Sequence, residues 1–409
     1  MSESVNTAKT LNSSEMNAPR KLAFIIYQAG AQADGGLNSI TELVTELAPG
    51  NRLLVFTNRE GRFTTAWRDA GCEVAVVPMR ESQFHEGDGA RGGRVGRFLG
   101  RLLTNWRIAR RLRAESFDLL HANDNRSFWS GLFAARLTGT PIILNVRDAL
   151  PPRYATAPLR WRLAYALCDR LLVLSRDMER YWRNLLNEKG AGKVSYLYSI
   201  VRPEVTVPDA AARRRERAAL GLPDNAFVIS YVASFHPKKR QAEFLEHAAG
   251  PILSQAPEIR IVFVGDCDPA TNPAAARAVE VANQLDAGER IQFSGFTREP
   301  WRWYVASDLV LLASEREGLP RCLIESLCYG TPFASFAVSS AQELADLSGA
   351  GSVAPLGDYP ALVEAVAERR QLAASDASLR DRRAAEARAR FEATAAREGY
   401  LALLNSLTR

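Results

Sequence analysis

The chain has 409 residues, which is more than one hydrophobic core usually supports, so we expect two domains. Apolar residues make up 47% and charged residues 24%, as is ordinary for a soluble globular protein. Lys and Arg outnumber Asp and Glu by 52 to 46, and so mild an excess indicates solubility rather than a nucleic-acid partner.

The cysteines are odd in number, scattered and never spaced as Cys-x-x-Cys, which argues against a disulfide framework or a structural zinc site and favours a reducing compartment. They are Cys72, Cys168, Cys267, Cys322 and Cys328. Residues 1–20 are rich in Ser, Asn, Thr and Ala and lack the apolar core of a signal peptide, so they predict a disordered tail. No apolar run reaches the roughly 18 residues of a membrane span, and we expect a cytoplasmic protein.

From residue 21 the chain alternates short apolar runs with helical stretches, which is the pattern of parallel α/β units. A glycine loop, residues 30–36, separates the first strand from a helix that ends near Leu47. The strands of this first domain, residues 21–202, are expected at Leu22–Tyr27, Leu53–Thr57, Val74–Val77, Asp118–His121, Pro141–Val146 and Arg170–Leu174.

Prolines and a run of Ala and Arg interrupt this alternation between Arg202 and Arg217, which predicts an interdomain linker there. The alternation restarts in the second domain, residues 203–384, and the chain from Asp358 onward is helical in composition. The strands of the second domain are expected at Phe227–Val232, Ile259–Val264, Ile291–Phe293, Leu309–Leu312 and Phe333–Phe336. Two α/β halves of similar size predict two doubly wound sheets that face a ligand-binding cleft.

Residues 314–332 form the most informative motif, Ser-Glu-Arg-Glu-Gly-Leu-Pro-Arg-Cys-Leu-Ile-Glu-Ser-Leu-Cys-Tyr-Gly-Thr-Pro. A strand leads into a polar loop, Pro320 suits the first turn of a helix, and Gly330 suits its end. The free amides at the helix start predict an anion site that would suit a diphosphate. Glu317 and Glu325 are poorly explained by phosphate binding, but they make sense as acceptors of hydrogen bonds from sugar hydroxyls.

This motif resembles the signature of retaining glycosyltransferase family 4, in which seven residues separate two glutamates. The resemblance implies a GT-B fold of two Rossmann-like domains, with a C-terminal helix near residues 385–409 completing the first. It also implies that Glu317 contacts the donor sugar and that Glu325 holds the ribose hydroxyls. Further donor-binding residues implied in this stretch are Gly318, Leu319 and Arg321. The alternative is a solvent-exposed acidic loop and helix.

A basic loop, Val232–Arg240, directly follows another predicted strand, and its three consecutive cations could neutralise a diphosphate leaving group. The loop resembles the first loop of the family's donor domain, with Lys239 at the family's lysine position. Ser234 stands where the family usually has arginine, which leaves the phosphates one cation fewer unless Lys238, Arg240 or Arg321 substitutes. The alternative is a solvated basic turn.

Three glycine loops resemble further parts of the family's donor site. Gly265 resembles the turn behind the nucleotide, and Gly295 with Phe296 resembles the loop that packs on the base. In the first domain, Gly35 and Gly36 resemble the loop that approaches the donor phosphate. Glycine after a strand is commonplace, so each of these signals is weak by itself.

On the acceptor side, His121 matches a position where the family often has histidine. The family often has a second histidine at the end of the strand that ends at Val146, and this chain has Arg147 near that position instead. Asp148 is a candidate replacement, and the alternative is a structural turn aspartate.

The resemblance implies transfer of a hexose from a nucleoside-diphosphate sugar with retention of configuration, in which Glu317, Lys239, Asp148 and His121 are the catalytic candidates. The alternatives are a non-catalytic partner subunit of the same fold, a nucleotide-sugar epimerase and a dinucleotide oxidoreductase. The last is disfavoured because the glycine loop after the first strand, residues 30–36, does not read Gly-x-Gly-x-x-Gly. We expect neither a metal nor a cofactor for this transfer.

Residues 91–113 hold eight arginines and no acidic residue, and apolar side chains recur among them at three- and four-residue steps. Such a basic amphipathic helix suits the surface of an anionic membrane. We therefore expect a peripheral protein on the inner face of the cytoplasmic membrane, acting on a lipid-linked glycan or polysaccharide precursor. The alternative is a core-packing helix with a solvated basic face.

Overall fold

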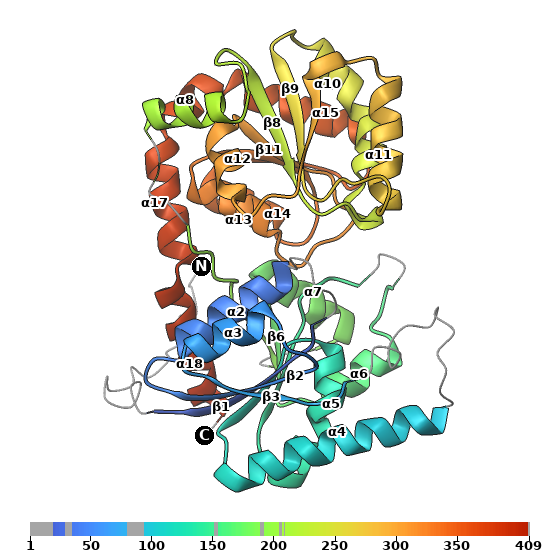
Figure 1. Cartoon of the computed structure of the whole chain (residues 1–409), viewed down its shortest axis with the longest axis vertical. Helices are drawn as coiled ribbons and strands as arrows, with labels where there is room; N and C mark the ends of the chain where they lie inside the picture. The colour runs from blue at the N-terminus through green and yellow to red at the C-terminus, as the bar shows by residue number, and fades with distance from the viewer. Residues whose placement is uncertain are drawn as a thin grey trace, which may run out of the picture. The chain divides into compact units, whose positions relative to one another are not determined.

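Figure 1 shows a computed structural model of the chain, which describes residues 19–28, 35–79, 94–150, 154–188, 192–203, 207 and 209–407. Most of the predicted tail, residues 1–20, and most of the glycine loop, residues 30–36, lie outside these ranges. So do residues 91–93 and the side chains of residues 94–98, at the start of the basic segment.

The described residues divide into two compact units. The first unit takes those within Met1–Val146, Pro158–Leu172 and Ala396–Arg409, and the second takes those within Arg147–Ala157 and Val173–Ala395. The predicted domain boundary between residues 202 and 203 stays a prediction.

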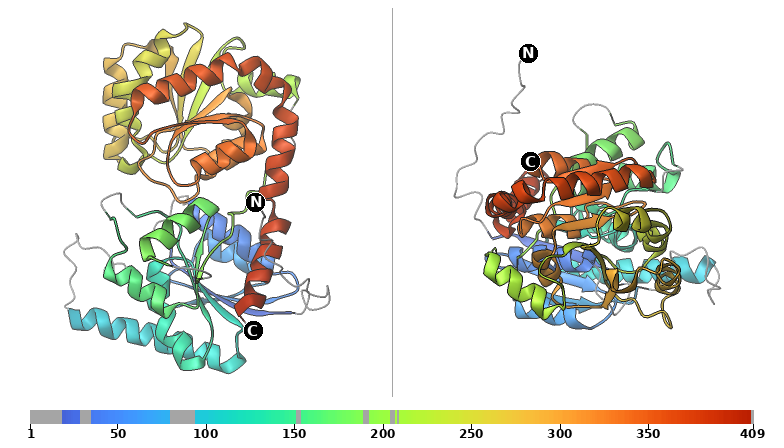
Figure 2. Two further views of the ribbon diagram at one scale, coloured as in Figure 1. Left: turned by 180° about the vertical axis from the view of Figure 1, so that it is seen from behind. Right: turned by 90° about the horizontal axis from the view of Figure 1, so that it is seen from above.

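The first sheet has seven strands in the order β3-β2-β1-β4-β5-β6-β7, and β1 pairs in parallel with both β2 and β4. The strands are β1 (Lys21–Ile26), β2 (Arg52–Thr57), β3 (Glu73–Val76), β4 (Leu119–Ala122), β5 (Ile142–Asn145), β6 (Arg170–Val173) and β7 (Val194–Tyr196). The helices between them are α2 (Gly35–Leu47), α3 (Arg62–Asp69), α4 (Arg94–Glu115), α5 (Asn125–Thr138), α6 (Leu159–Leu167) and α7 (Arg176–Leu186). Helices cover both faces of the sheet (Figures 1 and 2), and in β1 every residue after Lys21 is accordingly buried.

The second sheet has six strands in the order β10-β9-β8-β11-β12-β13, and β8 pairs in parallel with both β9 and β11. The strands are β8 (Phe227–Val232), β9 (Ile259–Val264), β10 (Ile291–Gly295), β11 (Leu309–Leu312), β12 (Phe333–Phe336) and β13 (Gly351–Ala354). Its helical elements are α8 (Ala210–Ala219), η2 (Pro237–Lys239), α9 (Gln241–Phe244), η3 (Leu245–Ala249), α10 (Gly250–Ser254), α11 (Pro273–Gln284), η4 (Gly288–Arg290), α12 (Pro300–Ala306), α13 (Arg321–Cys328), α14 (Ala341–Ser348), α15 (Tyr359–Gln371), α16 (Ala373–Ser378) and α17 (Arg380–Phe391).

The chain ends in α18 (Ala393–Leu407), which is counted with the first unit from Ala396 onward. Tyr400 of this helix is buried, and its hydroxyl lies 3.0 Å from Nδ1 of His121 in β4. Asn405 accepts a hydrogen bond of 2.8 Å from Arg20, just before β1. This part of α18 is therefore built into the first unit.

Two parallel sheets with interleaved helices confirm the predicted fold class of two doubly wound α/β domains. Every predicted strand is present, with small differences at the ends. β7 and β13 were not predicted, because β7 has only three residues and β13, Gly-Ser-Val-Ala, has little apolar surface. Among the described residues, no helix is both long and apolar enough to cross a bilayer.

The second half of the Arg202–Arg217 segment is not irregular, because Ala210 onward forms α8. Arg213 and Arg217 of this helix both reach the carboxylate of Asp308, with N···O distances of 2.6 and 2.5 Å. The same carboxylate accepts a hydrogen bond of 2.8 Å from the backbone N–H of Val228 in β8. The run of Ala and Arg therefore anchors a helix to the second sheet.

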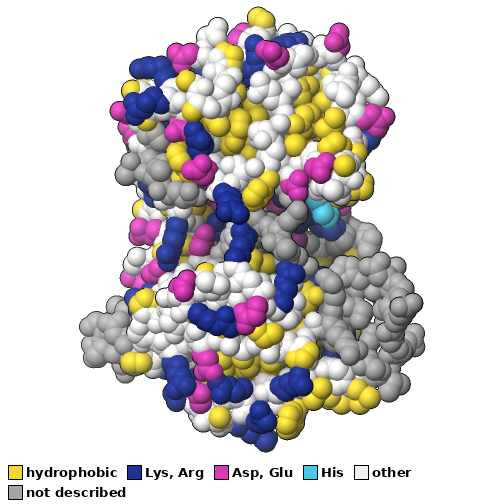
Figure 3. Space-filling model, in the orientation of Figure 1, with side chains coloured by type: hydrophobic (Ala, Val, Ile, Leu, Met, Phe, Trp, Pro, Cys, Tyr) yellow, Lys and Arg dark blue, Asp and Glu magenta, His cyan; other side chains and the backbone are white. Residues whose placement is uncertain are grey.

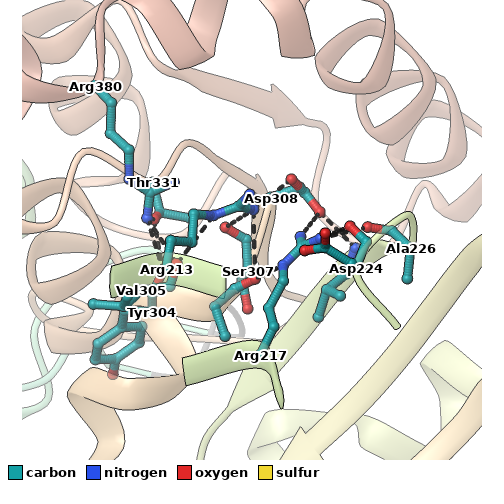
Figure 4. Close-up of polar contacts among 12 residues, drawn as sticks. Arg213, Arg217, Asp224, Ala226, Tyr304, Val305, Ser307, Asp308, Thr331 and Arg380 are labelled. Carbon is teal, nitrogen blue, oxygen red and sulfur yellow. Dashed lines mark hydrogen bonds and ion pairs between the residues drawn. The ribbon is translucent and has the colours of Figure 1, made fainter. Parts of the chain in front are cut away.

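The arginines around Asp308 also hold the C-terminal end of α12 (Figure 4). Arg217 donates to the Ala306 carbonyl at 2.9 Å, and Arg380 donates to the Val305 carbonyl at 3.1 Å. The last carbonyls of a helix lack partners within the helix, and cations stabilise that end. This arginine frame, consisting of Arg213, Arg217 and Arg380, therefore fixes the position of α12.

We predict that Asp308→Asn destabilises the second unit by about 3–5 kcal/mol, because Arg217 is buried and would lose its charged partner. The measurement is the midpoint of urea unfolding. Glu386→Gln is the control, because Glu386 pairs with Arg382 at the exposed surface and its loss should hardly move the midpoint. Equal midpoints for Asp308→Asn and the control would show that the arginine frame does not anchor α8.

Candidate functional site

The basic loop after β8 and the polar loop after β11 lie side by side, because the two strands are neighbours in the second sheet. The backbone N–H of Glu315 donates to the Lys238 carbonyl at 2.7 Å. The buried hydroxyl of Tyr231 joins the same loops, since it accepts from the Ala313 N–H at 2.9 Å and donates to the Lys239 carbonyl. These hydrogen bonds therefore hold the two loops in a fixed position relative to each other.

This junction brings Lys239 and Glu317 together, with Nζ and Oε1 2.5 Å apart and both side chains largely buried. Burial acts to lower the pKa of Lys239, but the Glu317 carboxylate outweighs it and the pKa is raised. A raised pKa keeps the ammonium charged at neutral pH. The stabilisation from the pair is present below the ordinary lysine pKa of 10.5 and is lost as the pH rises through the raised value.

A second ion pair lies beside the first, between Lys238 Nζ and Asp148 Oδ2 at 3.1 Å. Asp148 follows β5, and its segment is counted with the second unit. Gly318 allows the approach, because a Cβ atom built there would lie 1.9 Å from the Arg147 carbonyl oxygen. The structure thus brings together the predicted residues Lys238, Lys239, Asp148 and Glu317.

Glu325 lies in α13, which begins at Arg321 with Pro320 at its N-cap position rather than in its first turn. Its Oε2 accepts a hydrogen bond of 2.7 Å from the hydroxyl of Tyr304, and its Oε1 lies 3.1 Å from Nε of Arg321. Burial, together with the Glu325 carboxylate, raises the pKa of Tyr304 well above its usual value, so the phenol is the donor. Tyr304 belongs to α12, and the arginine frame therefore also sets the position of Glu325.

The remaining predicted donor residues follow β8, β9 and β10, which are neighbours in the sheet. Ser234 is exposed, and a Cβ atom at Gly265 would lie 2.1 Å from the Ala233 carbonyl oxygen. The N–H of Gly265 donates to the Gly295 carbonyl at 3.0 Å, and Phe296 is 55% exposed. These loops form the carboxyl edge of the sheet, where ligands of such folds bind.

Three predicted site residues, His121, Gly35 and Gly36, belong to the first unit. His121 is fully buried beneath Tyr400 and packs against Phe24, so its ring has no access to solvent in this structure. Gly35 and Gly36 begin α2.

Three residues that support the site were not predicted from the sequence, namely Tyr231, Tyr304 and Ser340. Ser340 has a left-handed backbone, with φ at 73°, and its hydroxyl donates to the Gly318 carbonyl at 2.8 Å. A tyrosine inside an apolar strand, such as Tyr231, is the one signal in the sequence that pointed to a buried hydrogen bond.

Leu319, the next predicted donor residue in the sequence after Gly318, is buried. Among the described residues, no group of three or more His, Cys, Asp or Glu side chains could hold a metal ion.

We predict that Tyr304→Phe weakens nucleotide binding roughly 10- to 100-fold, because a buried hydrogen bond to a carboxylate contributes about 1.5–3 kcal/mol. Calorimetric titration of the variant measures this loss. If Tyr304 acts through Glu325, the double variant Tyr304→Phe, Glu325→Gln should bind nucleotide about as weakly as Glu325→Gln alone. Unchanged binding by Tyr304→Phe, or fully additive losses, would contradict this role.

Comparison with known proteins agrees with this arrangement. A model described as glycosyl transferases group 1 matches residues 212–390, and a glycosyl transferase 4-like domain matches residues 35–192. The D-inositol 3-phosphate glycosyltransferase of Thermobispora bispora is 27% identical over an alignment of 344 residues that covers 76% of this chain and 76% of its own. The UDP-Gal:alpha-D-GlcNAc-diphosphoundecaprenol alpha-1,3-galactosyltransferase of Escherichia coli is 24% identical over 54% of this chain and 58% of its own.

Among solved structures, Anabaena Alr3699/HepE in complex with UDP-glucose aligns with a TM-score of 0.76 at 19% identity, covering 95% of this chain and 100% of that one. This likeness shows the shared GT-B fold. The two family models together match most of the chain, one in each half, and the chain belongs to the group 1 glycosyltransferases of GT-B fold.

Proposed function

We propose that this glycosyltransferase takes its sugar from a nucleoside-diphosphate donor bound at the carboxyl edge of the second sheet. The observation that carries the proposal is the buried pair of Lys239 and Glu317 at the junction of two strand-end loops. Alr3699/HepE was crystallised with UDP-glucose, and the Escherichia coli relative is named for UDP-Gal, which supports a donor of this class.

The roles follow from the chemistry of the pair. Lys239 would stabilise the negative charge that develops on the departing diphosphate, and Glu317 would accept hydrogen bonds from the donor sugar. Glu325, oriented by Tyr304, would hold the ribose hydroxyls. The backbone of Gly265 and Gly295 and the exposed ring of Phe296 would surround the base.

Lys238 is the cation best placed to offset the absence of an arginine at position 234. It is four residues from Ser234 in the same loop, and its partner Asp148 is 51% exposed. Arg321 is engaged with Glu325, and the Arg240 side chain lies close to Gly357. We therefore propose that donor phosphate draws Lys238 away from Asp148, which would leave the carboxylate free beside the acceptor.

We further propose that the reaction retains the anomeric configuration and needs no metal ion. With retention, the donor phosphate itself could deprotonate the acceptor, so no strong protein base would be needed. Asp148 is the exposed acceptor-side candidate, whereas the proposed role of His121 would require Tyr400 to move.

The second candidate function is a non-catalytic partner subunit, which Ser234 and Arg147 favour because both depart from the family pattern. Turnover of any nucleotide-sugar by the purified protein would exclude it.

We predict that Lys239→Ala lowers the rate of transfer roughly 10- to 100-fold, with a smaller effect on donor binding, because the lost cation acts mainly in the transition state. Glu317→Gln should reduce discrimination among donor sugars. Both are measured by kcat and KM on a panel of nucleotide-sugars.

Glu386→Gln is the control for these variants, since Glu386 lies on α17 in an exposed pair. EDTA should leave the wild-type rate unchanged. Wild-type kinetics in both site variants, or loss of activity with EDTA that manganese restores, would contradict the proposed chemistry.

We also propose that α4 binds an anionic membrane and that the acceptor is a lipid-linked glycan. Leu99, Leu102, Leu103 and Trp106 of this helix are 39–58% exposed, and a helix packed into the core by these residues would bury them. Arg110 lies over the Trp106 ring at 5.4 Å, which pairs a cation with an amphipathic aromatic. A basic helix with exposed Leu and Trp suits a headgroup surface.

We predict that the protein sediments with vesicles of phosphatidylglycerol and phosphatidylcholine, and that bound protein is released as the salt concentration rises, because the attraction is screened. Vesicles of phosphatidylcholine alone are the comparison. Equal recovery with both kinds of vesicle would contradict an electrostatic membrane site.

A further inference from the structure

Exposed apolar side chains are concentrated on three consecutive helices of the first unit. Eight of the 13 large hydrophobic side chains that are exposed among the described residues belong to α4, α5 and α6. Four are on α4, and the others are Phe133 and Leu137 on α5 and Leu159 and Leu163 on α6, at 46–80% exposure. A basic patch on α4 alone does not account for the last four.

The exposed stripe of α4 points away from the protein. The buried residues Thr104, Asn105, Ile108 and Leu112 occupy the other face of the helix. Asn105 fixes this face onto α5, because it donates to the Trp129 carbonyl at 3.3 Å and accepts from the Ala134 N–H at 3.0 Å. The apolar stripe of α4 is therefore left for a partner.

Hydrogen bonds link the three helices to one another near their C-terminal ends. Arg113 of α4 donates to the Leu137 carbonyl of α5 at 3.3 Å. Arg136, next to Leu137, donates to the Leu167 carbonyl at the end of α6 and pairs with Asp169 at 3.5 Å. Basic and hydrophobic side chains are interspersed over the part of the first unit where α4 and α5 lie (Figure 3).

The positive charge of these helices favours an anionic partner. α5 and α6 each contain two arginines and no acidic residue, and the only acid of α4 is Glu115 at its last position. Glu115 is already paired with Arg52 at 2.6 Å. Leucines interleaved with arginines, as in the exposed Leu159-Arg160 and Arg162-Leu163, fit phosphate headgroups above an apolar layer.

We propose that α4, α5 and α6 together form one membrane-docking surface for an anionic bilayer, here called the three-helix surface. Its members are Leu99, Leu102, Leu103, Trp106, Phe133, Leu137, Leu159 and Leu163, with the arginines between them. The inference rests on the proposed membrane association of α4 and adds α5 and α6 as contacts of their own. Three anchoring helices would fix the orientation of the first unit on the bilayer, which a single helix would not.

The test compares full-length variants on vesicles of equal parts phosphatidylglycerol and phosphatidylcholine. Leu159→Glu with Leu163→Glu changes α6 only, and Leu103→Glu with Trp106→Glu changes α4 only. The control is Leu372→Glu with Leu379→Glu, at two leucines of the second unit that are 40% and 43% exposed. Hydrolysis of a soluble nucleotide-sugar and the thermal midpoint report whether each variant is folded.

We expect the α6 variant and the α4 variant each to bind these vesicles at least tenfold more weakly than wild type, and the control to bind as wild type does. If only the α4 variant loses binding, the three-helix surface is wrong and the proposed role of α4 stands. If the wild type does not bind, both membrane proposals fail, while sugar transfer is tested separately by its own assay. If the α6 variant instead abolishes a concentration-dependent self-association of the wild type, the surface is a protein interface and the proposal is overturned.

Discussion

The candidate site depends on one buried phenol. The Tyr231 hydroxyl accepts a hydrogen bond from the loop after β11 and donates one to the loop after β8, so two strand-end loops become a single body. A buried hydroxyl that uses both its donor and its acceptor holds its neighbours firmly, because breaking either bond leaves a polar group unsatisfied. Lys239 and Glu317 come from these two loops, and their short contact is a consequence of that junction.

A second chain of contacts reaches Glu325. Asp308 gathers the arginines of α8, the arginine frame holds the carbonyls of α12, and Tyr304 of α12 binds the Glu325 carboxylate. Glu317 is therefore held by Lys239 and by the loops that Tyr231 joins, whereas Glu325 is held by Tyr304. This is the arrangement expected for a rigid binding surface, in which the orientation of each carboxylate is set before a ligand arrives.

Sequence patterns predicted most of this fold because parallel strands buried on both faces leave a clear apolar signal, as in Phe227–Val232 and Ile259–Val264. The spacing of Glu317 and Glu325 likewise indicated the family, since it depends on one strand, loop and helix. Contacts between segments that lie far apart in the sequence could not be predicted from local patterns. Nothing local distinguishes the arginines of α8 from a linker, and the burial of His121 depends on Tyr400, 279 residues away along the chain. The pattern of α4 showed that the helix is amphipathic, but only the fold shows which face is exposed.

The proposed reaction is the transfer of a sugar from a nucleoside diphosphate with retention of configuration. Proton NMR during turnover tests it most directly, because the coupling of the anomeric proton identifies the first product formed. An α-linked donor incubated with the protein should release its nucleoside diphosphate and yield the α-anomer before mutarotation. First appearance of the β-anomer would contradict retention, and absence of turnover with every nucleotide-sugar tested would contradict the enzyme itself.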